Sequence, residues 1–203
     1  LYAISPDGAE KWHWENRLAV PSEPVVSSDG AVYFGQLDPG SYVTALNYDG
    51  SQRWQYNISD RVNNVSIDAR GNIYFTSENR DITKLKPNGQ SKWRALNNFT
   101  FGFTPIADVD DDVYVGANIS GLPGLYKLSG ADGSVIWQTR VDNNFVYSMF
   151  DPVYDKSQDR FYATAKGFGQ ILTINRADGK ISKNIVDGQG MPTTKIAVLA
   201  DSL

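Results

Sequence analysis

The chain has 203 residues, of which 41% are hydrophobic and 21% are charged, and its formal net charge is −4. This composition is that of an ordinary globular protein, and the acidic balance argues against a nucleic-acid partner, whose binding surface needs a basic stripe. The longest aliphatic run near the end, residues 196–200, is far shorter than the ~20 residues of a membrane-spanning helix, so no membrane span is expected.

The amino-acid inventory leaves little material for catalysis or metal binding. The chain has no cysteine, which excludes disulfides, thiolate metal sites and a cysteine nucleophile. It has one histidine, His13, so histidine metal sites and Ser-His-Asp triads lack most of their components. We therefore assign no catalytic, cofactor-binding or metal-binding residue.

In chain order, the predicted elements are short strands joined by turns. Residues 1–14 predict a hairpin that turns at Asp7-Gly8, and the strand AVYFG around Tyr33 follows a turn at Asp29-Gly30. The same two features then alternate to the end of the chain. Further hairpin turns are expected at Asp49-Gly50, Asn88-Gly89, Asp132-Gly133 and Asp178-Gly179, and further aromatic strands around Tyr74, Tyr114 and Tyr162.

These features define a repeat of about 40 residues. Its glycines, Gly8, Gly50, Gly89, Gly133 and Gly179, are 42, 39, 44 and 46 residues apart. Four residues after each of the first four glycines stands a tryptophan: Trp12, Trp54, Trp93 and Trp137. The fifth copy has Lys183 at that place. The Asp-Gly and Asn-Gly pairs favour type I′ turns, in which both central residues have positive φ.

Four short strands every 40 to 45 residues are typical of propeller blades. We predict an all-β fold, a β-propeller of four-stranded antiparallel blades with about five blades, forming one domain over residues 1–203. The repeated indoles are expected to fill the wedge between neighbouring blades, which makes the tryptophans and the turn glycines structural residues.

The register of the repeat leaves two arrangements open. In one, residues 1–14 complete the last blade together with residues 193–200 and close a five-bladed ring. In the other, the chain is an incomplete part of a larger wheel. We favour the second, because the last repeat lacks the aromatic strand that every other repeat has.

The repeated string, A-[LI]-[ND]-x-x-[DN]-G-x-x-x-W followed by [VI]-Y-x-[GT], resembles the PQQ-like β-propeller repeat with its tryptophan-docking motif. The best matches are residues 3–12 and 45–54, and the resemblance covers essentially the whole chain. The family includes large quinoprotein dehydrogenases and also non-enzymatic propellers such as the outer-membrane-protein assembly lipoprotein of Gram-negative bacteria. The chain resembles the second type more, because the dehydrogenases carry adjacent cysteines and this chain has none.

The run Asp108-Val109-Asp110-Asp111-Asp112 raises the question of calcium. An EF-hand loop that begins at Asp108 needs glycine at position 113 and glutamate at position 119, where this chain has Val113 and Ile119. The run also occupies the place of the Asp29-Gly30 turn. We therefore interpret it as an acidic hairpin turn, with a loosely bound calcium ion as the alternative.

The segments that join one blade to the next carry the candidate binding residues. Three of these linkers contain an Asn-Asn pair followed by an apolar residue, and three contain an arginine. We predict a ligand or partner site there, although asparagine also suits tight turns without any ligand. The candidates are Arg17, Arg61, Asn63, Asn64, Asn97, Asn98, Phe99, Arg140, Asn143, Asn144 and Phe145.

A well-formed repeat without a recognisable catalytic set favours a binding protein over an enzyme. We expect a non-catalytic scaffold or recognition propeller outside the cytoplasm, in the periplasm, at the cell surface or secreted, with a protein or glycan as partner. The alternatives are part of a quinoprotein dehydrogenase or a propeller lyase, and a lectin-like propeller that binds sugars.

Overall fold

The computed structural model describes residues 1–15, 22–36, 41–58, 60–78, 80–95, 99–100, 104–108, 110–119, 122–140, 148–149, 152–166 and 170–186. Within these ranges all regular secondary structure is β-strand. They contain no helix with the length and apolar character that crossing a membrane requires. The all-β fold predicted from the repeat is confirmed.

The strands form five antiparallel sheets, which we number as blades in chain order. The first blade is a hairpin of β1 (Tyr2–Ile4) and β2 (Glu10–His13). The second contains β3 (Val25–Val26), β4 (Val32–Gln36), β5 (Ser41–Leu46) and β6 (Gln52–Ile58). The third contains β7 (Val62–Ile67), β8 (Ile73–Ser77), β9 (Asp81–Leu85) and β10 (Ser91–Ala95).

In the last two blades, two short segments share the place of the first strand. The fourth blade contains β11 (Phe99–Thr100), β12 (Ile106–Ala107), β13 (Val113–Ile119), β14 (Leu122–Leu128) and β15 (Val135–Arg140). The fifth contains β16 (Ser148–Met149), β17 (Val153–Asp155), β18 (Arg160–Lys166), β19 (Gln170–Asn175) and β20 (Ile181–Val186). Both β11 and β12 pair with β13, and both β16 and β17 pair with β18, so each of these blades keeps a four-stranded plan.

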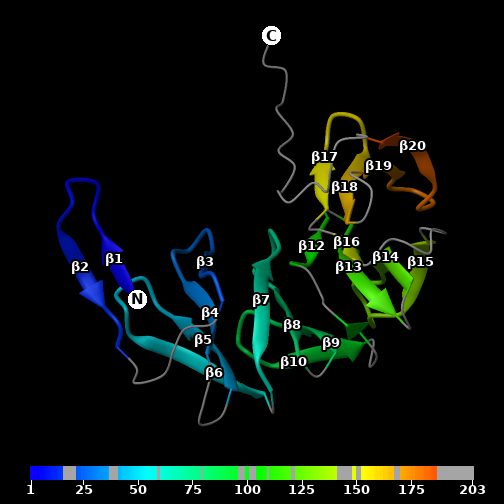
Figure 1. Cartoon of the computed structure of the whole chain (residues 1–203). Coiled ribbons are helices and arrows are strands. Elements are labelled where there is room, and N and C mark those ends of the chain that lie inside the picture. The colour runs from blue at the N-terminus through cyan, green and yellow to red at the C-terminus, as the bar shows by residue number, and fades with distance from the viewer. Residues whose placement is uncertain are drawn as a thin grey trace.

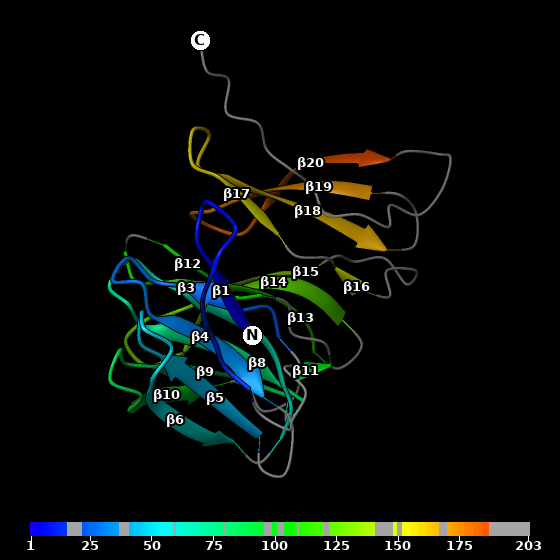
Figure 2. The ribbon, with the colours of Figure 1, turned by 90° about the vertical axis from the view of Figure 1, so that its left-hand side faces the viewer.

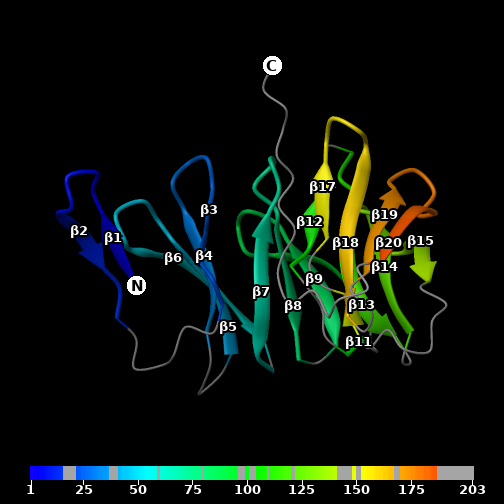
Figure 3. The same cartoon turned by 45° about the horizontal axis from the view of Figure 1, so that its top comes forward.

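The blades lie side by side along an open arc, with β1 and β2 at one end and β16–β20 at the other (Figure 1). Figure 3 shows the same order after a 45° turn. Figure 2 views the arc from the β1–β2 end, where β4, β5 and β6 run side by side. Among the described strands, none of the first blade pairs with one of the fifth. Residues 193–200, which the closed-ring arrangement requires, lie outside the described residues.

The glycine turns differ in type from the expectation. In the first hairpin, Gly8 N donates to Ser5 O at 2.9 Å and Ser5 N donates to Ala9 O at 2.8 Å. Gly8 has φ 86°, whereas Asp7 is not in the positive-φ region. The loop is therefore a three-residue turn closed by a glycine bulge, and the type I′ prediction was wrong. The physical reason is that the Asp7 side chain caps the loop by accepting from Ala9 N at 3.4 Å, which needs no positive φ at Asp7.

The core lies between the blades. Tyr33, Tyr74 and Tyr114, three of the four tyrosines of the repeated strand, are each at most 1% exposed, and the fourth, Tyr162, is half-buried. One continuous cluster joins Tyr33 of the second blade to Phe75 of the third. Each blade thus buries apolar surface against its neighbour, which is why a single blade cannot fold alone.

The repeated tryptophans contact the glycine turn of the following blade. Trp12 Nε1 donates to Tyr48 O at 2.7 Å, and a Cβ on Gly50 would lie 2.7 Å from the Trp12 ring. The same contact recurs twice along the arc. Trp54 docks on the turn of Pro87 and Gly89, and Trp93 docks on the turn of Gly130 and Gly133.

The last docking contact is different. The Trp137 ring packs on Gly179, but its buried Nε1 has no hydrogen-bond partner among the described residues. Instead, the Thr139 hydroxyl donates to Gly179 O. The fourth and fifth blades are therefore joined by ring packing and a threonine.

Candidate functional site

The site lies on the face of the arc that carries the connections between blades, which we call the linker face. The connection between β6 and β7 lies against the turn after β8, because Glu78 N donates to Arg61 O at 2.9 Å. The Arg61 and Glu78 side chains also form an ion pair at 3.6 Å, and both are about half exposed. The glycine turns lie at the opposite ends of the strands.

A cavity of about 300 Å³ lies between the second and third blades, and we call it the interblade cavity. Its lining comes from the end of β6 in the second blade and from three strands of the third blade. The lining residues are Tyr56, Asn57, Ile58, Phe75, Asp81, Thr83 and Arg94. A volume of this size is at the lower end of those of small-molecule pockets and accommodates one large side chain.

One wall of the interblade cavity holds a buried carboxylate. Asp81 is 2% exposed, its Oδ1 accepts from the Ser77 hydroxyl at 2.7 Å, and its Oδ2 accepts from Nε and Nη2 of Arg94. The Arg94 side chain is 51% exposed. The carboxylate is thus neutralised from the solvent side, since a buried carboxylate needs both an opposite charge and hydrogen bonds.

The opposite wall is apolar. The rings of Tyr56 and Phe75 face each other across the two blades with their centroids 6.1 Å apart. Ile58, which is 8% exposed, continues this wall. The interblade cavity therefore places a small apolar wall, in which Phe75 is 1% exposed, beside an ion pair of zero net charge.

Three of the linker residues singled out in the sequence lie near this site. Arg61 is exposed beside Glu78, and Asn63 and Asn64 are half-buried in β7. Asn63 falls at an irregularity in the pairing of β7 with β8. None of the three is among the described residues that line the interblade cavity.

Two further candidates belong to strands, with their side chains outside the description. Phe99 pairs through its backbone with Ile119, and Arg140 ends β15 opposite Gly124. The other six candidates lie outside the described residues. They are Arg17, Asn97, Asn98, Asn143, Asn144 and Phe145.

The residues that line the interblade cavity were missed because sequence reasoning looked at linkers instead of strand ends. A signal was present in the alignment of the repeats. Asp81 and Arg94 stand where the preceding blade has Tyr42 and Gln55, so two charges replace uncharged residues at the corresponding strand positions.

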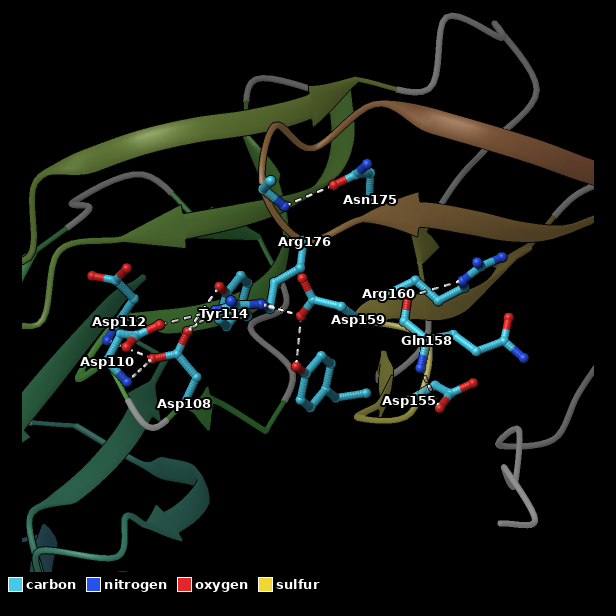
Figure 4. A network of polar contacts seen from close by, with 12 residues as sticks. Asp108, Asp110, Asp112, Tyr114, Asp155, Gln158, Asp159, Arg160, Asn175 and Arg176 are labelled. Carbon is cyan, nitrogen blue, oxygen red and sulfur yellow. Dashed lines mark hydrogen bonds and ion pairs between the residues drawn. The ribbon is translucent and has the colours of Figure 1, made fainter. Parts of the chain in front are cut away.

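A second polar cluster joins the fourth and fifth blades on the side of the glycine turns (Figure 4). Arg176 Nη1 donates to Asp108 Oδ2 at 2.9 Å and to Asp110 Oδ2 at 3.3 Å, and Nε donates to Asp159. Tyr114 donates to the same Asp108 oxygen at 2.9 Å. Burial by itself lowers the pKa of Arg176, but Asp159 and its neighbours raise it above the ordinary value, so this guanidinium stays charged.

The acidic run thus forms a hairpin turn whose carboxylates pair with cations of the protein. Asp111 has φ 73° at the place that glycine takes in other repeats, and Asp108 N donates to Asp112 O at 3.0 Å. Fully buried Lys84 contacts Asp111 at 2.5 Å across the third and fourth blades. Burial lowers the pKa of Lys84, and the Lys84 ammonium lowers the pKa of Asp111 against the effect of burial.

Comparisons with known proteins agree with this architecture. A family model described as outer membrane protein assembly factor BamB matches residues 78–200. The solved structure of BamB from Moraxella catarrhalis is similar with a TM-score of 0.71 at 15% identity, over 87% of this chain and 56% of that one. A protein of unknown function from Bacteroides caccae is similar with a TM-score of 0.59 at 14% identity, over 92% of this chain and 74% of that one.

The chain spans little more than half of the Moraxella catarrhalis structure. At these identities the structural likeness establishes the propeller fold. A sequence comparison with curated proteins found no match.

Proposed function

Because the chain belongs to the family described as outer membrane protein assembly factor BamB, we propose that it is a non-catalytic scaffold that acts outside the cytoplasm in outer-membrane-protein assembly. The observation that carries the proposal is the family match over more than half of the chain. The partner that we propose is a protein, either a component of the assembly machinery or an outer membrane protein in transit.

The linker face supports a protein partner. It combines the half-buried ring of Tyr56, which packs on the core residue Phe75, with the half-exposed guanidinium of Arg94. Aromatic residues and arginine are the side chains that dominate binding energy in protein interfaces. The rigid arc of docked blades holds these groups in place, which reduces the ordering cost of association.

Photo-crosslinking in the periplasm of a Gram-negative bacterium tests the proposal. A photoreactive amino acid replaces the exposed Asn57 or Arg61 on the linker face, and exposed Lys86 or Asn88 at the glycine turns serves as the matched control. We expect crosslinks to outer-membrane assembly proteins from the linker face at several times the yield of the control face.

The competing enzyme hypothesis has its own readout. Saturable uptake of pyrroloquinoline quinone with calcium, accompanied by dye reduction, would contradict a non-catalytic scaffold. Crosslinks of equal yield from both faces, or none to any assembly protein, would contradict the proposed partner. A glycan array with reproducible hits would favour the lectin alternative.

A further inference from the structure

The second blade is an internal reference for the interblade cavity, because its strands pair in the same register as those of the third blade. In both blades a threonine stands at the centre of the corresponding face. The residue pairs that correspond are Thr44–Gln55 with Thr83–Arg94, and Gln36–Tyr42 with Ser77–Asp81.

In the second blade, two side-chain amides satisfy the central threonine. The Thr44 hydroxyl donates to Gln36 Oε1 at 2.8 Å and accepts from Gln55 Nε2 at 3.2 Å. Gln55 Nε2 also lies 3.3 Å from Gln36 Oε1. Thr44 and Gln36 are fully buried, so carboxamide groups occupy this place in the second blade.

In the third blade the same place has no amide. The Ser77 side chain is shorter than that of Gln36, and its hydroxyl donates to Asp81 instead of contacting the central threonine. The Arg94 guanidinium also donates to Asp81. Thr83 is 2% exposed and lines the interblade cavity. No hydrogen bond joins its hydroxyl to a described residue, and the hydroxyl is not one of the fully buried side-chain atoms that lack a partner. This hydroxyl is therefore open to a hydrogen-bonding group that enters the interblade cavity.

We propose that the interblade cavity binds a peptide group, together with its apolar side chain, from an extended segment of a protein partner. The peptide group takes the place that the Gln36 and Gln55 carboxamides occupy in the second blade and pairs with the Thr83 hydroxyl. This inference rests on the proposed function, because it names the chemistry that the linker face recognises.

The charges and the lining residues of the interblade cavity favour a neutral peptide group with an apolar side chain. The ion pair of Asp81 and Arg94 has no net charge, which suits a neutral amide better than an ion. A guanidinium has five donors, and Asp81 uses two of those of Arg94. Half-exposed Arg94 therefore keeps donors for a peptide carbonyl, and Tyr56 and Phe75 cover the apolar side chain.

The test uses a blocked tripeptide, acetyl-Ala-Phe-Ala-amide, titrated into the purified chain and followed by amide chemical shifts in NMR. We expect saturable shifts at Thr83, Arg94 and Tyr56. Thr83→Val should weaken binding by about 2- to 10-fold, the contribution of one hydrogen bond. Thr44→Val, the matched change in the second blade, should leave the affinity unchanged.

The same pair of variants has a readout without peptide. Thr83→Val removes an unpaired hydroxyl and should keep or raise the melting temperature, whereas Thr44→Val breaks two hydrogen bonds and should lower it. A Thr83→Val protein that melts lower than wild type while Thr44→Val does not would overturn the inference.

A triple variant transfers the side chains of the second blade into the third: Ser77→Gln, Asp81→Tyr and Arg94→Gln. If it folds, its own amides fill the interblade cavity, and the peptide shifts should disappear. The inference would be overturned if the wild type showed no shifts. It would also be overturned if the triple variant or Thr83→Val bound the peptide with wild-type affinity. The proposed scaffold function is tested separately by the photo-crosslinking experiment. If the peptide does not bind but the linker face still gives more crosslinks than the glycine turns, the scaffold function stands, and only the loss of that difference would contradict it.

Discussion

The indole nitrogen of Trp54 in the second blade donates to the carbonyl oxygen of Pro87 in the third blade at 2.9 Å. The same tryptophan lies over Gly89, where a Cβ would come within 2.8 Å of the ring. One side chain thus joins two blades by a hydrogen bond and by a contact that only glycine permits. This arrangement leads to predictions on stability.

Trp54→Ala should lower the free energy of unfolding by about 3 kcal/mol, since it removes both the packing of the ring and the hydrogen bond to Pro87. Denaturant unfolding followed by circular dichroism measures the change. Trp54→Phe should lose about 1 kcal/mol, because it keeps most of the packing and loses the hydrogen bond.

Trp137→Phe provides the matched control for the hydrogen bond. The Trp137 Nε1 has no partner among the described residues, so this change should destabilise the chain less than Trp54→Phe. An equal loss in the two variants would show that the hydrogen bond from the indole does not contribute to the adhesion of the blades.

Gly89→Ala should destabilise the chain more than Gly8→Ala. Both glycines have positive φ, 82° and 86°, so each alanine variant carries a backbone strain of about 1–2 kcal/mol. The new methyl group at residue 89 also collides with the Trp54 ring, whereas nothing lies within 4 Å of a Cβ at residue 8. Chemical denaturation of both variants isolates the contact as their difference, and identical losses would refute it.

Arg176→Met should destabilise the fifth blade by about 2–3 kcal/mol. The change removes the cation from Asp108, whose side chain is 5% exposed, and leaves that carboxylate with neutral donors only, the Tyr114 hydroxyl and the backbone N–H groups of Asp110 and Asp112. Lys180→Met is the control, because Lys180 is 82% exposed and its ion pair with Asp178 should contribute little. Hydrogen exchange of β19 and β20 localises the effect, and unchanged exchange in Arg176→Met would contradict it.

The stability of the fold at acidic pH should depend on the ionisation of Asp29. The Ser27 hydroxyl, then Arg53 and the Ala31 amide, lower the pKa of Asp29 from 3.8 to about 2. A carboxyl group whose pKa is lower in the folded state stabilises the fold above its unfolded pKa, and this contribution disappears as the pH falls from about 4 to about 2. Carboxyl NMR titration of Asp29 should give a midpoint near 2.

Asp29→Asn should therefore make the melting temperature less dependent on pH between 4 and 2. Exposed Glu23→Gln removes the same charge from the same blade and should leave the wild-type dependence in place. A midpoint of Asp29 near 4 would contradict the prediction.

The sequence predicted the blades well because their determinants are local. The spacing of Gly8, Gly50 and Gly89 places each hairpin, and all three have positive φ in the structure. The turn type was predicted less well. Asp7 and Gly8 are equally compatible with a two-residue turn and with a bulged three-residue turn, and the backbone hydrogen bonds of Ser5 decide between them.

The candidate binding residues in the linkers show that the repeat pattern predicts strands and turns but not which side chains form a site. Arg61 lies on the linker face, Asn63 and Asn64 belong to β7, and none of the three belongs to the described lining of the interblade cavity. Sequence spacing identifies the face because antiparallel strands alternate in direction. It does not say which side chains meet across two blades.

By itself, the sequence determined an all-β chain of fanned four-stranded blades with a tryptophan in four successive repeats, since turns and strand alternation depend on neighbours only a few residues apart. Only the tertiary structure decided that Thr83 lines the interblade cavity beside Asp81 and Arg94. That property depends on residues of β6 in one blade and of β8, β9 and β10 in the next, which together line the cavity although they are distant in the chain.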